Sequence, residues 1–185
     1  MNYYLKDLGR GFGTFIKINT WTLIKNNFLL NMGENYIVFS IGNDKTNQSE
    51  INNSIDKPNN SVNSKDASNA NEANILNVKI FSGNIRHDIL QFSPSKSPFT
   101  IGRSTECDIP IDDGMLSRVH STVQYKDGNW YIIDGQIQDN GGNKKSTNGT
   151  WIYALEDIQI NDQTTFKANH NLFICTFSKP NGTNL

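Results

Sequence analysis

The segment FTIGRSTECDIPIDDGMLSRVH (residues 99–120) places a Gly-Arg pair at the end of one apolar run and a Ser-Arg-Val-His cluster after the next. The runs FTIG and CDIPI have the length of β-strands, and the DDG that follows them is typical of a turn. If the two polar ends meet, two guanidinium groups and a hydroxyl lie close together. That combination is suited to binding a doubly charged anion.

Similar strand-like runs fill the rest of residues 75–178, among them ILNVKIF, HSTVQY, NWYIID, TWIYA and LFICTF. Turn residues separate them at intervals of about 8–12 positions, which predicts an all-β antiparallel sandwich or barrel. No segment has the 3.6-residue apolar period of a helix, so we expect helices to be minor. Cys175, inside LFICTF, is expected to be buried.

The composition limits the classes of protein that this chain can belong to. Its 185 residues suffice for one domain or one domain plus a fragment, and 36% of them are hydrophobic, enough for a packed core. The net charge of −1 argues against the broad basic surface that nucleic-acid binding needs. Cys107 and Cys175 are too few for a disulfide framework and lack zinc-site spacing.

No targeting or membrane segment is recognisable in the sequence. The first residues lack the apolar core of a signal peptide, and no apolar run approaches the roughly 20 residues of a membrane-spanning helix. We therefore expect a soluble intracellular protein, in the nucleus or the cytoplasm. We expect it to act without a cofactor, a metal, a membrane or a nucleic acid.

Residues 43–73 consist almost entirely of Asn, Ser, Asp and Lys. Such a segment cannot bury enough apolar surface to offset the entropy of ordering it, so we expect a disordered linker. The sequence then divides into a partial β repeat at 1–42, the linker at 43–73, a full domain at 74–178 and a tail at 179–185.

The partial repeat is recognised by an internal alignment. Residues 13–41 align without gaps on residues 149–177, and YYLKDL (3–8) corresponds to WYIIDG (130–135). The later copy carries nine extra residues, QIQDNGGNK, before its Gly-Thr. Residues 1–42 thus resemble the back half of the later domain, without its front half.

A lone half-sandwich would expose an apolar face and unpaired strand edges. We expect the missing half, a partner chain or the full domain to cover the partial repeat. Because the sequence starts inside a repeat, we expect it to be a piece of a longer tandem protein.

Three short motifs carry a family resemblance: GR at 102–103, SRVH at 117–120 and STNGT at 146–150. In this order, on an all-strand background, they resemble the forkhead-associated (FHA) domain. The resemblance covers about residues 75–178, whereas residues 3–42 match only the family's C-terminal half. It implies an FHA-type antiparallel β-sandwich of eleven strands whose loops bind phosphothreonine peptides.

The resemblance also implies roles for individual residues. The phosphate would be contacted by Arg103, Ser117 and Thr147, with Arg118 close by, and Asn148 would bond the peptide backbone. Gly102, His120 and Gly149 would support the site structurally, with His120 bracing the binding loop. Phe12 stands where the full domain has Asn148, so we expect the partial repeat to bind no phosphothreonine.

The predicted function is therefore a non-catalytic, phosphothreonine-binding module for phosphorylation-dependent protein–protein interaction. The alternative is a phosphate-independent interaction scaffold of the same fold. We find no nucleophile–base pair and no metal-ligand set, so we expect no enzyme.

Simpler local interpretations stay open for three features of the motifs. Arg103 would pair with Asp108 or Asp112, or NGT would form an ordinary hairpin turn. Lys144 and Lys145 would lie in a solvated turn or add to the attraction for phosphate.

Overall fold

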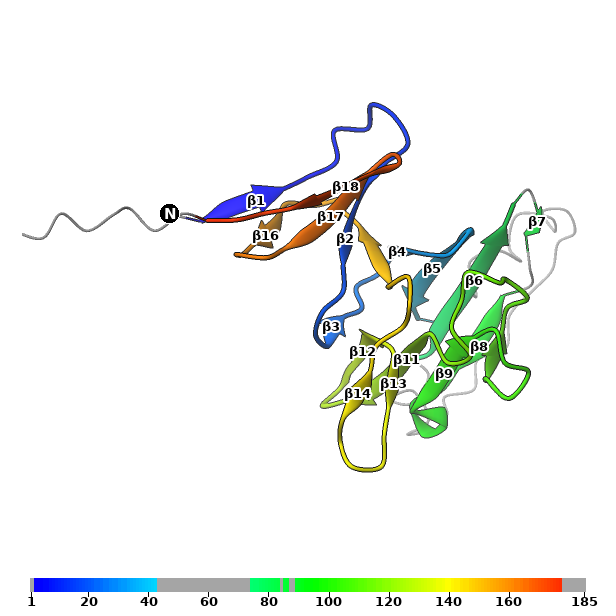
Figure 1. Cartoon of the computed structure of the whole chain (residues 1–185). Coiled ribbons are helices and arrows are strands. Elements are labelled where there is room, and N and C mark those ends of the chain that lie inside the picture. The colour runs from blue at the N-terminus through cyan, green and yellow to red at the C-terminus, as the bar shows by residue number, and fades with distance from the viewer. Residues whose placement is uncertain (1, 43–73, 84, 87–88, 178–185) are drawn as a thin grey trace, which may run out of the picture.

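The computed structural model describes residues 2–42, 74–83, 85–86 and 89–177 (Figure 1). The expected linker and tail lie outside the described residues. The described part is almost entirely β-structure, with one 3₁₀ turn at Pro94–Lys96 and no α-helix. The all-β fold class is therefore confirmed, and in these ranges no helix is long and apolar enough to cross a membrane.

A five-stranded sheet forms one layer. Its order is β10 (Ile109–Pro110), β9 (Phe99–Gly102), β11 (Ser121–Lys126), β12 (Asn129–Asp134) and β3 (Thr22–Leu23). All neighbours are antiparallel except β10 and β9. Strand β3 comes from the partial repeat, so the layer combines distant parts of the chain.

A nine-stranded sheet forms the other layer. Its order is β18 (Asn171–Ile174), β17 (Thr165–Ala168), β2 (Thr14–Lys17), β15 (Trp151–Tyr153), β4 (Phe28–Met32), β5 (Asn35–Ile41), β6 (Leu76–Ser82) and β7 (Ile85–Arg86), and β8 (Leu90–Phe92) also pairs with β6. Two small sheets pair β1 (Tyr3–Leu5) with β16 (Ile158–Ile160), and β13 (Gln136–Ile137) with β14 (Asn143–Lys144).

The hydrophobic core lies between the two large sheets. The nine-stranded sheet contributes fully buried residues from β4, β5 and β6, and the five-stranded sheet contributes them from β9, β11 and β12. Phe92 stacks on Phe99 at 3.9 Å between ring centroids, and the buried Trp130 donates a hydrogen bond to the carbonyl of Asn74. Each such apolar side chain contributes about 1.5–3 kcal/mol when buried.

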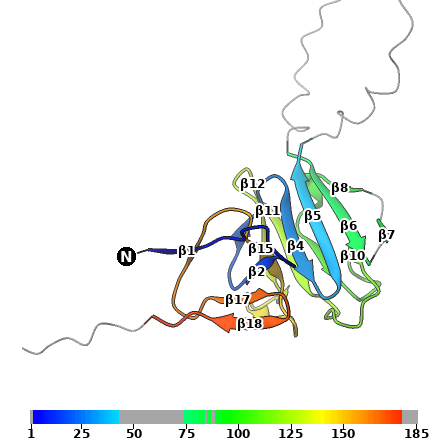
Figure 2. The ribbon, with the colours of Figure 1, turned by 90° about the horizontal axis from the view of Figure 1, so that it is seen from above.

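Strands from residues 14–41 lie inside this sandwich and complete it. Strand β5 pairs with β6 along a seven-residue ladder, β4 pairs with β15, and β3 pairs with β12. Figure 2 shows β4, β5 and β6 side by side. Of the three expected ways to cover the partial repeat, the structure shows packing against residues 74–154. The division at 42 and 74 stays a prediction, although the strand pairing crosses it.

The two copies of the repeat exchange strands with one another. In the β15–β4 pair Trp151 lies opposite Asn31, and in the β2–β17 pair the equivalent residues Phe15 and Lys167 lie opposite each other. The registers of the β12–β3 and β1–β16 pairs correspond in the same way. Strands β3 and β4 of the first copy therefore pair with β12 and β15 of the second, and strands β16 and β17 of the second copy pair with β1 and β2 of the first.

The last strands of the chain lie away from the sandwich core. In Figure 1, β1, β16, β17 and β18 extend to one side of the strands that form the five-stranded sheet. All four residues of β18 are exposed, and Cys175 just after it is only half-buried. The expectation that Cys175 is buried was wrong, because within the described part of the chain no second layer faces β18.

Candidate functional site

Three loops at one end of the sandwich surround a pocket of about 700 Å³. They follow β9, connect β10 to β11, and connect β14 to β15. All five predicted binding residues line this pocket: Arg103, Ser117, Arg118, Thr147 and Asn148. The structure thus brings together residues that the sequence places in three separate motifs.

Gly102 allows the first two loops to approach each other. A Cβ atom at this position would overlap the carbonyl oxygen of Arg118. The close approach is fixed by backbone hydrogen bonds, from Arg103 N to the carbonyl of Ser117 (3.1 Å) and from Ser104 N to the carbonyl of Arg118 (3.1 Å). Glycine is needed here because any side chain would separate the two arginine-bearing loops.

Ser117 connects the second loop to the third. Its Oγ accepts a hydrogen bond from the backbone N–H of Thr147 (3.0 Å) and lies 3.5 Å from Thr147 Oγ1. The two hydroxyl groups therefore face the same small volume at the pocket wall. An anion placed there could accept from both of them.

His120 connects the second and third loops from the interior of the protein. Its ring is fully buried, with Nδ1 accepting from the backbone N–H of Ser117 (3.1 Å) and Nε2 lying 3.1 Å from the carbonyl of Gly149. This pattern requires a neutral ring with the proton on Nε2, because a protonated Nδ1 could not accept. Gly149 has φ of +79°, which glycine adopts without strain.

The stability of the protein is expected to fall on mild acidification because of His120. Burial lowers the pKa of His120 below its ordinary value of 6.5, and the hydrogen bond to Gly149 opposes part of that shift. Below about pH 6.5 the unfolded chain takes up a proton at this residue that the folded protein does not, so unfolding becomes more favourable. Above that pH, His120 is neutral in both states and does not change the free energy of unfolding with pH.

Urea unfolding between pH 7.5 and 5.5, together with NMR titration of the histidine rings, measures this effect. His170→Gln, which removes an exposed histidine, identifies the ring signal of that residue in the NMR titration. Titration of His120 at or above pH 6.5 in the folded protein would contradict the expectation.

The two arginines at the pocket rim have no carboxylate partner in the described ranges. The ion pairs found there are Lys6–Asp157 and Lys25–Glu156, both remote from the pocket. Asp108 instead accepts hydrogen bonds from the N–H and the hydroxyl of Thr100. The simpler interpretation, in which Arg103 pairs with Asp108 or Asp112, therefore finds no support.

Asn148 holds the pocket wall together in addition to lining it. Its half-buried side chain donates from Nδ2 to the carbonyl of Met115 (2.7 Å), and the backbone carbonyl of Asn148 accepts from Trp151 Nε1 (3.0 Å). The amide thus ties the third loop to the second.

Comparison with protein families gives a match that spans all three pocket loops. Residues 99–173 match the family model of the FHA domain. The chain contains an FHA domain. FHA domains generally mediate phosphothreonine-dependent protein interactions and are non-catalytic modules. A search of curated proteins and a search of solved structures each found no match.

Asp134 is a supporting residue of the FHA domain that the sequence analysis missed. Its carboxylate is only 1% exposed and accepts from Ser146 Oγ (2.6 Å), Ser146 N (3.2 Å) and Thr150 Oγ1 (2.9 Å). A buried carboxylate needs such donors, and these fix the loop that carries Thr147. The available signal was an aspartate at the end of the apolar strand NWYIID.

The partial repeat also positions the binding loop. Asp113, in the turn before Ser117, accepts from Glu34 N (3.0 Å) and Asn35 Nδ2 (2.7 Å), both at the β4–β5 turn. Its other oxygen accepts from Met115 N (2.7 Å). Glu34 and Asn35 thus anchor the second pocket loop, which nothing in the sequence pattern indicated.

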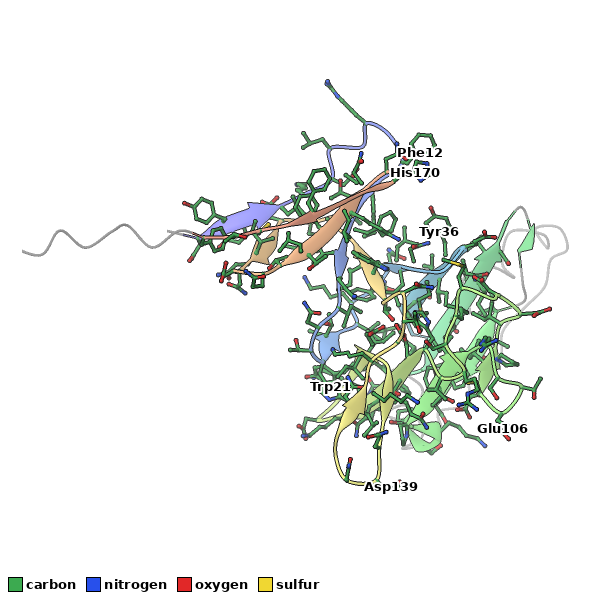
Figure 3. The ribbon with its side chains drawn as sticks, in the orientation of Figure 1. Phe12, Trp21, Tyr36, Glu106, Asp139 and His170 are labelled. Atoms are coloured by element: carbon green, nitrogen blue, oxygen red, sulfur yellow. The ribbon has the colours of Figure 1, made fainter. Side chains whose placement is uncertain are left out.

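The nine extra residues of the second copy form the β13–β14 hairpin beside the pocket. Lys144 in β14 and Lys145 after it are exposed, and both line the pocket. Lys145 Nζ donates to the carbonyl of Asn19 (2.6 Å), a further contact with the partial repeat. Figure 3 shows Asp139 at the far tip of this hairpin.

Phe12, the counterpart of Asn148 in the partial repeat, lies elsewhere. It is 78% exposed, and Figure 3 shows it at the opposite end of the molecule from Asp139. No residue of the pocket comes from its loop. In the described stretches, no group of three or more His, Cys, Asp and Glu side chains is placed to hold a metal ion.

Proposed function

We propose that this FHA domain binds phosphothreonine in a peptide segment of a partner protein and so makes a protein–protein interaction depend on phosphorylation. The observation that carries the proposal is the juxtaposition at the pocket: two guanidinium groups without a carboxylate partner among the described residues, beside two hydroxyls 3.5 Å apart. Arginine clusters are a recurring means of recognising phosphorylated motifs.

Each pocket residue has a role that fits its position. The guanidinium of Arg103 can donate two parallel hydrogen bonds to phosphate oxygens. Ser117 and Thr147 can donate from their hydroxyls, and Arg118 adds positive charge at the rim. Asn148 would bond the peptide backbone next to the phosphothreonine. Phosphothreonine offers three strong acceptor oxygens and a charge of about −1.5 to −2 at neutral pH.

A hydrolytic role for the same pocket has no support in the geometry. Activation of the Ser117 hydroxyl would need a nearby general base. Among the described residues, the imidazole that contacts Ser117 is that of His120, and both of its ring nitrogens are engaged with backbone groups of Ser117 and Gly149. Binding of the phosphate without hydrolysis is therefore the role that we propose for this pocket.

The proposal is tested by titrating the full chain with one peptide in three forms, carrying phosphothreonine, threonine or glutamate at the same position. We expect measurable binding of the phosphorylated form and at least tenfold weaker binding of the other two, because they lack the phosphate acceptor oxygens. Screening a degenerate phosphothreonine library first supplies the peptide. Equal affinity for all three forms would instead identify a phosphate-independent scaffold.

A further inference from the structure

The first strand and the last three strands of the chain form a back half for which the described residues supply no front half. We define the back face as β1, β16, β17 and β18, and the front segment as residues 74–128, which contain β6 to β11. The single front segment of the described chain is already packed against β4 and β5 of the first copy. In the repeat, the strands β1, β16, β17 and β18 of the back face correspond to β12, β3, β4 and β5.

Side chains on the back face keep the apolar character of the core positions to which they correspond. Ile37 in β5 is 0% exposed, whereas its counterpart Phe173 in β18 is 43% exposed. Leu30 in β4 is fully buried, whereas its counterpart Phe166 in β17 is only partly covered. Phe166 and Phe173 stack on each other at 4.9 Å, and within the described part of the chain no second layer covers this aromatic surface.

In the described ranges, two strands of the back face also lack a neighbour that their counterparts in the sandwich have. The outer edge of β5 carries the seven-residue ladder to β6, whereas β18, its counterpart, is the terminal strand of the sheet as described. Strand β12 is paired on both sides, by β11 and β3, whereas its counterpart β1 is paired by β16 alone in the same ranges. An exposed edge next to an apolar face is a template for adding strands.

We propose that the back face binds the front segment of a second FHA domain, carried by a polypeptide outside these 185 residues. The occupant would place a strand equivalent to β6 along β18 and a strand equivalent to β11 along β1. The exchanged pairs β15–β4 and β2–β17 have matching registers. The back face therefore has the same arrangement as the equivalent strands on which the front segment packs.

A second copy of this chain does not satisfy the same requirement. The described ranges of each copy contain two back halves and one front segment. Copies that associate through their front segments therefore always leave some back halves without a front segment. This inference does not depend on phosphate binding, because the back face contains none of the pocket residues.

The decisive experiment supplies a front segment in the correct register. Asn2 corresponds to Asn129 in the repeat, so residues 74–128 are joined directly ahead of Asn2 of the full chain. Hydrogen exchange of residues 165–174 is then compared with that of the unmodified chain. We expect exchange in this range to slow by at least tenfold, because both the outer edge of β18 and the face of Phe173 become covered.

Two variants of the fused chain sharpen the result. Phe173→Asp should abolish the added protection, whereas Leu172→Asp should retain it. Leu172 is 62% exposed on the opposite face of β18, and its counterpart Tyr36 stays 42% exposed in the filled half. Both variants should fold, since neither side chain is buried.

Unchanged exchange of residues 165–174 in the fused chain would overturn the proposal. So would protection that survives Phe173→Asp. Light scattering of the unmodified chain provides a further check: a homodimer that Phe173→Asp dissociates would show that a second copy covers the face, and would overturn it as well.

Discussion

Replacing Arg103 with alanine is expected to weaken binding of a phosphothreonine peptide by roughly 10- to 150-fold. The range follows from the 1.5–3 kcal/mol contributed by hydrogen bonds to charged groups, at about 1.4 kcal/mol for each tenfold change in affinity. We expect the lower part of the range, because the guanidinium is exposed at the rim and water screens its charge. Calorimetric titration of the phosphorylated peptide measures the effect.

The control for that substitution is Arg10→Ala. Arg10 is also exposed but lies outside the pocket, so its removal changes the net charge equally without touching the site. The affinity of the Arg10→Ala variant for the phosphothreonine peptide should stay within about twofold of that of the unmodified chain. If Arg103→Ala bound as tightly as Arg10→Ala, the phosphate would not be held at Arg103, and the assignment of the pocket would fail.

Ile37→Ala is expected to lower the free energy of unfolding by about 2–5 kcal/mol, the usual range for removing a buried isoleucine to alanine. The counterpart substitution in the second copy, Phe173→Ala, should cost less than about 1 kcal/mol, although it removes a larger side chain. The reason is that Ile37 is fully buried between the two large sheets, whereas Phe173 is 43% exposed. Urea unfolding of both variants makes the comparison.

This pair of substitutions tests which back half completes the sandwich. A larger loss of stability from Phe173→Ala than from Ile37→Ala would mean that β17 and β18, and not β4 and β5, pack on the front segment. Similar losses from both would mean that the two arrangements are populated together.

The sequence was informative where a local pattern determines the structure. Alternating apolar runs and regularly spaced turns predicted the all-β fold, and GR, SRVH and STNGT identified loops that do meet at one pocket. The internal repeat was also visible, because Gly13 and Gly149 begin segments that align without a gap.

The strand exchange could not be predicted in the same way. Both copies present nearly the same apolar pattern, so residues 28–41 and 164–177 are both suited to the same position beside β6 and β15. Only the three-dimensional arrangement shows which copy occupies it. Contacts such as Asp113 with Asn35 depend on that outcome, which is why the contribution of the partial repeat to the pocket had no signal in the sequence.

The order of these strands along the chain has a consequence for how the protein is made. Strands β4 and β5 leave the ribosome well before β6 to β12, and β15, which lies beside β4, is made later still. Their apolar side chains must wait for partners that are distant in sequence, and such non-local pairing is slow. During that interval we expect the nascent chain to expose Leu30 and Phe39 to the solvent, as apolar surface that a chaperone can bind.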